Sequence, residues 1–329
     1  MPHENHRTDL GGTDQPPFLH RPLEMREAFI AAHGWLSGLA REAQRPSVLV
    51  AAVDEHARVV DAVELGAGHS LVIGRHTGCG LWLECDSLSL RHLVAHARPA
   101  APGTPPLLWL WDLHTGRPFM TEDGQFNAAV RTQGPLYAAV GPYALLFIPL
   151  SGPGEAPWPA RAEAAWSALP PRRFLDQRSA EAAPLPRPRR RRLDGRPYQT
   201  DVCRQGALLT LSEPGERESP WAELRLEWEG RVERHFLSRE RLGQGVLLGR
   251  YERCGIRLSQ GLGSLSRVHL LLVRLGEEVL AIDTASTNGT RRGQMKIETT
   301  RLDEQDSLVL GSRLRLHWRR LHSAGTDRG

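Results

Sequence analysis

The sequence predicts an all-β protein with two β-sandwich domains, a linker rich in proline and arginine between them, and a short N-terminal helix. One observation is a series of short apolar runs, rich in valine, isoleucine and leucine and bounded by glycine and serine clusters. Such runs are typical of buried strands. The other is an internal repeat, because residues 73–83 and 248–258 share the same spacing of glycine, arginine and cysteine. A repeat of this detail predicts two copies of one domain.

Residues 1–45 are expected to form a polar tail and one helix. Residues 1–21 are polar with scattered glycine and proline, a composition typical of disorder. From Pro22 onward, apolar side chains recur at helical spacing, which predicts a helix packed on the domain that follows. The alternative is a small helix that binds a partner. The apolar face consists of Met25, Phe29, Ala32, Leu36 and Leu39.

Residues 46–150 are predicted to form the first sandwich. Apolar runs at 48–53, 71–73, 107–110 and 144–148 have the length and composition of strands. The Ser-x-x-His spacing of Ser89 and His92 recurs later in the chain at Ser266 and His269. The region is therefore interpreted as the first copy of the repeated domain.

Residues 151–204 are predicted to be the linker, because proline and alanine dominate and strand-forming residues are few. A short helix is expected at 160–169, before two prolines. Five arginines lie between Arg187 and Arg192. Such a run repels itself and favours a solvated spacer. The alternative is a weak contact with nucleic acid or another polyanion, because guanidinium clusters neutralise phosphates.

Residues 205–321 are predicted to form the second sandwich, followed by a polar tail at 322–329. Apolar side chains alternate with charged ones at 224–229 and again at 313–318, the pattern of strands with one solvated face. Three polar loops interrupt the apolar runs between residues 246 and 290. They are Gly249-Arg250, the segment from Ser266 to His269, and the segment from Ser286 to Thr290.

These loops carry residue types that suit a phosphorylated peptide. Arg250 offers a planar, permanently charged fork of donors, and Ser266 adds a hydroxyl donor. Arg267 can supply further positive charge. Asn288 has amide donors and a carbonyl acceptor that can pair with a peptide backbone, and Gly289 permits the positive φ that tight turns often need.

The ordered set Gly-Arg, Ser-x-x-His and Asn-Gly resembles the forkhead-associated (FHA) domain, a receptor for phosphothreonine peptides, as found in bacterial proteins. The resemblance covers about residues 222–318. It implies that Arg250 and Ser266 hold the phosphate, that Asn288 fixes the peptide backbone and that Thr287 lines the site. It also implies that Gly249, His269 and Gly289 shape the loops. The implied partner is a protein phosphorylated on threonine by a Ser/Thr kinase.

The first copy departs from this pattern at its third loop. The loop that follows Asp112, residues 113–117, contains no Asn-Gly pair. Arg75 and Ser89 remain, and they could hold a bare phosphate as a vestigial site. The alternative, which we favour, is a structural or protein-binding role for a degenerate copy.

Composition sets the outer limits of function. The formal net charge is +4 and the isoelectric point about 9.1, which is only mildly basic. Lys296 is the only lysine, a bias typical of a GC-rich bacterial genome. No secretory signal, no apolar run of membrane-spanning length, no cofactor motif and no catalytic motif is apparent, so we expect a cytoplasmic, non-catalytic binding protein without cofactors. The alternatives are a polyanion-binding protein and an adaptor whose FHA surfaces bind unphosphorylated partners.

Overall fold

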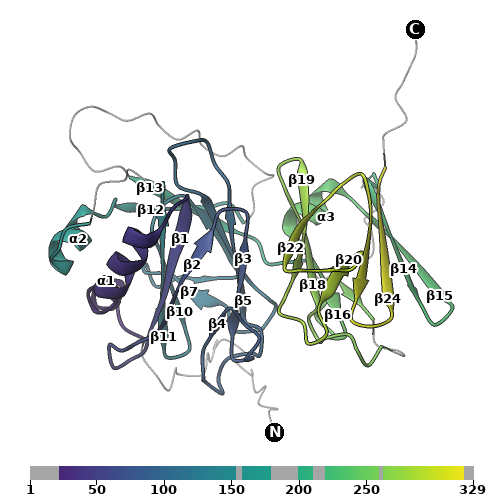
Figure 1. The fold of residues 1–329 in the computed structure, drawn as a ribbon, viewed down its shortest axis with the longest axis horizontal. Helices are drawn as coiled ribbons and strands as arrows, with labels where there is room; N and C mark the ends of the chain where they lie inside the picture. The colour runs from purple at the N-terminus through teal and green to yellow at the C-terminus, as the bar shows by residue number, and fades with distance from the viewer. Residues whose placement is uncertain (1–21, 153–157, 179–198, 210–218, 259–261, 322–329) are drawn as a thin grey trace, which may run out of the picture.

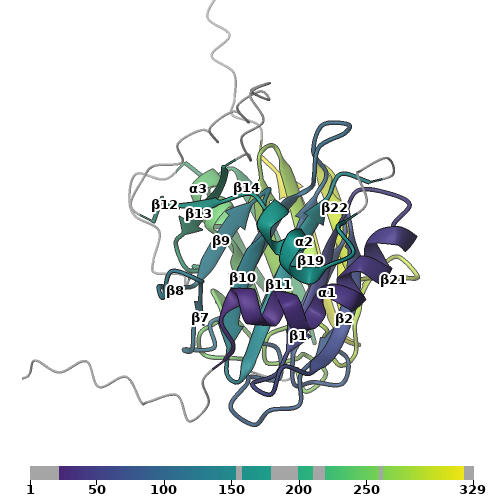
Figure 2. The same ribbon diagram turned by 90° about the vertical axis from the view of Figure 1, so that its left-hand side faces the viewer.

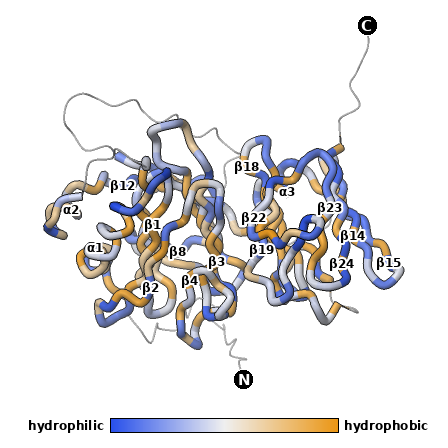
Figure 3. Tube along the Cα trace, in the orientation of Figure 1, coloured by the Kyte–Doolittle hydropathy of each residue, from blue (hydrophilic) through white to orange (hydrophobic). Residues whose placement is uncertain are grey.

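The computed structural model describes residues 22–152, 158–178, 199–209, 219–258 and 262–321. Within these residues strands far outnumber helices. The strands form two β-sandwiches lying side by side, with two helices at the outer end of the first (Figure 1). Apolar stretches run along the central strands of both domains, and many of the turns are hydrophilic (Figure 3). The prediction of an all-β chain with a short N-terminal helix is confirmed. Within the described part of the chain, no helix is both long and apolar enough to cross a membrane.

The first domain packs two sheets against each other. Their strand orders are β2-β1-β11-β10-β7-β8 and β12-β13-β9-β6-β5-β3-β4. The strands of the sandwich are β1 (Ser47–Val53), β2 (Val59–Gly66), β3 (Ser70–Gly74), β4 (Leu81–Trp82), β5 (Leu93–Arg98), β6 (Leu107–Asp112), β7 (Phe119–Met120), β8 (Phe126–Asn127), β9 (Ala129–Thr132), β10 (Leu136–Val140) and β11 (Tyr143–Leu150). Two further strands, β12 (Arg172–Asp176) and β13 (Thr200–Gln205), extend the second sheet.

The second domain also packs two sheets. Their orders are β15-β14-β24-β23-β20-β21 and β17-β16-β18-β19-β22. The strands are β14 (Ala222–Trp228), β15 (Arg231–Leu237), β16 (Val246–Gly249), β17 (Ile256–Arg257), β18 (Leu270–Leu275), β19 (Glu278–Asp283), β20 (Thr290–Arg292), β21 (Met295–Ile297), β22 (Thr299–Leu302), β23 (Gln305–Leu310) and β24 (Leu314–Arg320). One short helix, α3 (Arg239–Gln244), precedes β16 and begins with Ser238, whose side chain accepts the Arg241 N–H.

The predicted repeat is visible as one topology used twice. Strands β1 to β11 and β14 to β24 follow each other in the same order through both pairs of sheets. The matching cysteines also agree, because Cys79 and Cys254 are buried and each thiol donates to a backbone carbonyl 3.4 Å away. Burial raises the pKa of Cys79 to about 11 and that of Cys254 to about 12. The cysteines therefore belong to the packing of each copy, as their spacing in the sequence suggests.

The N-terminal helix α1 (Met25–Glu42) covers the outer face of the sheet that contains β1 and β11 (Figure 2). Phe29 and Leu36 are fully buried there against Leu49, Leu146 and their neighbours. Trp158 and Trp166 close the far side, with ring centroids 5.8 and 5.6 Å from that of Phe29. The predicted apolar face of α1 is the one that packs on the first domain.

The prediction of a linker over residues 151–204 is wrong for its described parts. A helix, α2 (Ala162–Ala168), forms within the expected 160–169 and packs near α1. Strand β13 pairs antiparallel with β9, and β12 pairs parallel with β13, so the first domain's sheet is extended. Both strands join the sheet through backbone hydrogen bonds, which side-chain composition does not reveal. The arginines between Arg187 and Arg192 and the predicted tails at 1–21 and 322–329 lie outside the described residues.

The two domains are docked through their sheets, not simply tethered. Side chains of β3, β5 and β6 in the first domain and of β16, β18 and β19 in the second share one buried apolar cluster. The two domains lie side by side in Figure 1. Successive side chains of a strand point to opposite faces. Leu248 and Leu270 therefore enter the core of their own domain, and the residues beside them enter the interface. The interface contains Val72, Val94, Trp109 and Trp111 from the first domain, and Leu247, Leu271, Val273 and Ile282 from the second.

Candidate functional site

The three predicted loops of the second domain meet at one end of one sheet. Gly249 ends β16, Ser266 to His269 lead into β18, and Ser286 to Gly289 follow β19. Strand β18 pairs antiparallel with both neighbours, so Leu270 lies opposite Leu248 on one side and Asp283 on the other. The topology thus brings together loops that are separated by up to about forty residues in the sequence.

The first loop is bound directly to the second. The Arg250 N–H donates to Ser266 O over 3.2 Å, and Arg250 Nε donates to Leu265 O over 2.5 Å. A Cβ atom at Gly249 would lie 2.1 Å from Arg267 O, a separation that no side chain tolerates. Glycine is therefore required where β16 passes the second loop.

The second and third loops are joined through Ser266 and Asn288. Ser266 Oγ accepts the Thr287 N–H over 3.0 Å. Asn288 Nδ2 donates to Ser264 O over 2.7 Å. A serine hydroxyl can still donate its own proton after accepting one, and an Asn amide keeps its carbonyl acceptor and a second N–H. The site can thus be held together internally and still offer polar groups to a ligand.

His269 braces the second loop from inside. Its side chain is fully buried, and its Nδ1 accepts the Ser266 N–H over 3.0 Å. Burial lowers the pKa of His269 to about 4, so the ring is neutral at pH 7. Because Nδ1 is the acceptor, the proton is carried by Nε2, which lies 3.9 Å from Asp283 Oδ2. The loop-shaping role that the resemblance implies for His269 stays a prediction, and this hydrogen bond is the contact through which it would act.

Asp283 organises the third loop, a role that the motif did not reveal. Its carboxylate accepts the Ser286 N–H and hydroxyl and the Thr290 hydroxyl, each over 2.7 Å. An aspartate followed three residues later by serine is the local signal for such a side-chain-to-backbone turn, and it could have been read from the sequence. Lys296 also lies against the third loop, and the motif did not reveal this. A Cβ at Gly289 would be only 2.9 Å from Lys296 Cε.

Four of the five predicted ligand-contacting residues lie at the surface. Arg250, Arg267, Thr287 and Asn288 are exposed, and Ser266 is buried beneath them. The loops thus expose two guanidinium groups and an amide and contain one buried hydroxyl. Such a surface favours an anion with several acceptor oxygens over an apolar ligand.

The first copy repeats the first two loops nearly bond for bond. Arg75 Nε donates to Leu88 O over 2.7 Å, and the Ser89 N–H donates to His92 Nδ1 over 3.2 Å. Asp112 binds the N–H and hydroxyl of Thr115, as Asp283 binds Ser286. Its third loop differs in sequence from that of the second copy, because it lacks the Asn-Gly pair. Binding of bare phosphate by Arg75 and Ser89 remains a prediction.

Arg117 takes the place of Asn288 in the first copy. Its Nη1 donates to Ser87 O over 2.7 Å, the same distance as from Asn288 Nδ2 to the matching carbonyl of Ser264. The long arginine thus supplies the loop-to-loop bond that the missing Asn-Gly turn would have made. Sequence reasoning missed this, because nothing in the spacing pairs residues 87 and 117.

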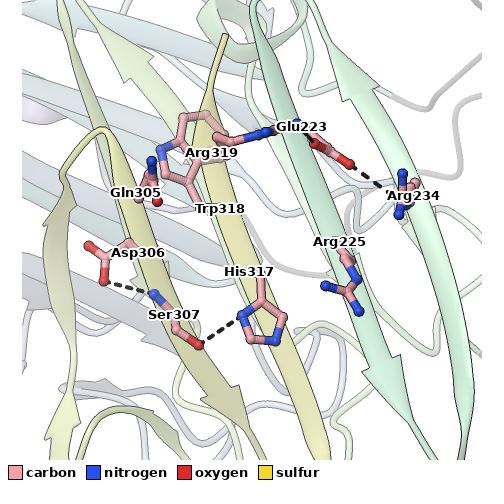
Figure 4. Close-up of a pocket in the computed structure, with 9 residues that line it drawn as sticks. All are labelled: Glu223, Arg225, Arg234, Gln305, Asp306, Ser307, His317, Trp318 and Arg319. Carbon is pink, nitrogen blue, oxygen red and sulfur yellow. Dashed lines mark hydrogen bonds and ion pairs between the residues drawn. The ribbon is translucent and has the colours of Figure 1, made fainter.

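A shallow hollow in the second domain lies on its other sheet and contains none of the predicted site residues (Figure 4). Its charged side chains pair with neighbours, as Glu223 does with Arg319 and Asp306 does with Arg292. Such cross-strand pairs are ordinary features of a solvated sheet face. The hollow is lined by Glu223, Arg225, Arg234, Gln305, Asp306, Ser307, His317, Trp318 and Arg319.

Comparison with known proteins gives a family match within the second domain. The model of the FHA domain matches residues 246–311. No curated protein matches the chain. Among solved structures, Mycobacterium tuberculosis Rv1747 FHA-1 is 24% identical over 32% of this chain and 100% of its own, with a TM-score of 0.25.

Two further solved structures illustrate the same likeness. The FhaA FHA domain, complexed with the intracellular domain of Rv3910, is 28% identical over 30% of this chain and 99% of its own, with a TM-score of 0.25. Mycobacterium tuberculosis EmbR, in complex with a low-affinity phosphopeptide, is 19% identical over 32% of this chain and 26% of its own, with a TM-score of 0.26. Each alignment covers about a third of this chain.

Proposed function

Because residues 246–311 form an FHA domain, we propose that this chain binds a protein segment carrying phosphothreonine and does so without catalysis. The binding surface is formed by the three loops of the second domain. The partner is a protein phosphorylated by a Ser/Thr kinase, and the chain acts as an adaptor for it. Arg250, Ser266, Arg267, Thr287 and Asn288 are the residues that meet the ligand.

The observation that supports this proposal is the set of hydrogen bonds between the three loops. Ser266 Oγ accepts the Thr287 N–H, and Asn288 donates to Ser264 O. Arg250 is tied by Nε to Leu265 O in the same structure. These bonds pre-organise the surface, so little side-chain and loop entropy is lost when a peptide binds.

The division of roles follows from the chemistry of each group. A phosphate carries a charge of about −1.5 to −2 near pH 7 and three strong acceptor oxygens. Arg250 and Arg267 supply exposed positive charge, and Ser266 supplies the short hydroxyl donor. Asn288 keeps an acceptor and a donor with which an extended backbone can pair. Thr287 lines the site between Ser266, which contacts the phosphate, and Asn288, which contacts the peptide backbone.

The test is calorimetric titration of the full chain with a phosphothreonine peptide library, alongside the unphosphorylated and phosphoserine forms. Arg250→Ala removes the main charged donor. A hydrogen bond to a charged group contributes about 1.5–3 kcal/mol, so affinity should fall about ten- to a hundredfold. Arg75→Ala is the matched control, because it removes the corresponding arginine of the first copy, and it should leave binding nearly unchanged.

Two results would contradict the proposal. One is an Arg250→Ala chain that retains its fold by circular dichroism and binds as tightly as the parent. The other is equal affinity for phosphorylated and unphosphorylated peptides, which would favour a phospho-independent adaptor surface. If Arg75→Ala were the damaging change, the active copy would be the first one.

A further inference from the structure

Arg91 belongs to the first domain, and its side chain reaches the third loop of the second domain. Its Nε and Nη2 donate to Ala285 O over 2.9 and 2.6 Å, and Nη2 reaches Thr287 Oγ1 at 3.4 Å. Only 8% of the residue is exposed. A guanidinium from one domain is therefore buried at the base of the other domain's recognition loop.

The carbonyl that Arg91 binds belongs to a strained position. Ala285 has a φ of 56°, which non-glycine residues adopt only at some cost. This residue starts the turn that carries Thr287 and Asn288. The Thr287 N–H is bound by Ser266, so the segment is fixed by the second domain's own serine at one point and by Arg91 at another.

Burying a guanidinium requires compensation, because the charged group loses its hydration. Arg91 obtains this from the Ala285 carbonyl and from the nearby carboxylate of Asp283, which favours the charged form. Burial lowers the pKa of Arg91 from its ordinary value. An arginine held in this way is a specific contact between the domains, unlike the exposed ion pairs elsewhere on the molecule.

The contact is reciprocated at the matching loop of the first copy. His114 corresponds to Ala285 and has a φ of 57°. Arg253 of the second domain donates to His114 O over 3.4 Å, and His114 Nδ1 lies 2.8 Å from Arg253 O. Each copy thus touches the third loop of the other with an arginine. The second copy has Val268 where the first has Arg91, and Val268 is buried in the interface.

We propose that Arg91 is a positioning residue for the phosphopeptide site, so that the first domain forms an integral part of the second domain's recognition loop. This inference rests on the proposed function. The apolar interface formed by β3, β5 and β6 with β16, β18 and β19 holds Arg91 in place. Arg91 in turn holds the loop in the conformation that presents Thr287 and Asn288.

The experiment compares full-length variants by titration with a phosphothreonine peptide that binds the parent. Arg91→Met keeps an apolar stem of similar length and removes the donors. Coupling between distinct sites commonly changes affinity about 5- to 150-fold, and we expect a loss of about tenfold. Arg91→Lys, which keeps the charge without the fork, should bind with intermediate affinity. Arg253→Met removes the reciprocal arginine and should bind like the parent.

A second measurement does not depend on peptide binding. Amide hydrogen exchange at Thr287 and Asn288 in the free protein should be faster in Arg91→Met and unchanged in Arg253→Met. If the parent binds no phosphopeptide, the proposed function fails, and unchanged exchange would then also overturn the role of Arg91. If the parent binds, parental affinity in a folded Arg91→Met chain overturns the inference. Where Arg91→Met does not fold, parental affinity in Arg91→Lys overturns it.

Discussion

A buried histidine supports the serine loop in both copies, and both rings are held neutral. Burial lowers the pKa of His92 and of His269 to about 4. His96, buried on β5 with Ser70 Oγ 3.0 Å from its Nδ1, has a pKa lowered to about 4 for the same reason. A neutral ring can accept the serine N–H at Nδ1, whereas a doubly protonated ring cannot. The serine loops therefore depend on His92 and His269 remaining uncharged.

This predicts that stability falls as pH is lowered through the window between about 6.5 and 4. In that window the unfolded chain protonates His92, His96 and His269 and the folded chain does not. The loss is about 2 kcal/mol for each histidine at pH 5. Asp112 opposes it by about 1 kcal/mol, because burial raises its pKa to about 6 and the folded state binds that proton more readily.

Urea denaturation at pH 7, 6 and 5 measures this directly. The free energy of unfolding should decrease across the series. His96→Gln should show a shallower decrease than the parent, because one of the three groups no longer titrates. A free energy that stays constant from pH 7 to pH 5 would contradict the prediction.

At the scale of single elements, the site depends on how closely β16 approaches the loop that precedes β18. The corresponding approach occurs in the first copy, where a Cβ at Gly74 would lie 2.6 Å from Leu90 O. The Gly-Arg pair thus has two separate tasks. Its glycine permits the approach, and its arginine Nε donates to a carbonyl of the following loop, Leu265 O in the second copy and Leu88 O in the first. This explains on physical grounds why glycine precedes arginine in both copies.

Gly249→Ala should therefore separate β16 from the Ser266 loop. Forcing extra volume into a packed site commonly costs about 1–3 kcal/mol. We expect a loss of that size in the free energy of unfolding of the full chain, together with weaker phosphopeptide binding. Gly263→Ala is the matched control, because no atom lies within 4 Å of its added Cβ. Equal stability and affinity in the two variants would show that the close approach is unimportant.

At the scale of the whole molecule, the docking of the two sheets determines whether an isolated domain stays monomeric. The second domain presents Leu247, Leu271, Val273 and Ile282 to the first domain. Without that partner, these side chains would form a contiguous exposed apolar patch on one sheet. Patches of this kind promote association.

An isolated 205–321 fragment should therefore self-associate with rising concentration, more strongly than the full chain at the same concentration. Size-exclusion chromatography with light scattering measures this. Leu271→Lys in the fragment should reduce the association, because it places a charge on the patch. A fragment that stays monomeric throughout would mean that the sheet face tolerates solvent. Phosphopeptide binding by the fragment should also be weaker than by the full chain, since Arg91 is missing.

Much of this architecture was readable from local patterns. Strand alternation, the N-terminal helix and the repeat all depend on spacing within short segments, where side-chain periodicity reports directly on structure. The three loops were located for the same reason. The continuous apolar run at 270–273 also indicates a strand covered on both faces. What covers the outer face could not be read from it, because an apolar side chain does not specify its partner.

Tertiary structure alone decided how the parts meet. Strands β12 and β13 joined the first domain's sheet through backbone hydrogen bonds, which leave little trace in side-chain composition. Arg117 replaced Asn288 in role although the two residue types differ, because both reach the same loop carbonyl. Arg91 lies 194 residues before Ala285, and no local pattern could pair them. The sequence by itself determined two copies of one domain and the polar groups of one site. The docking of two apolar sheet faces decided that one copy supports the recognition loop of the other.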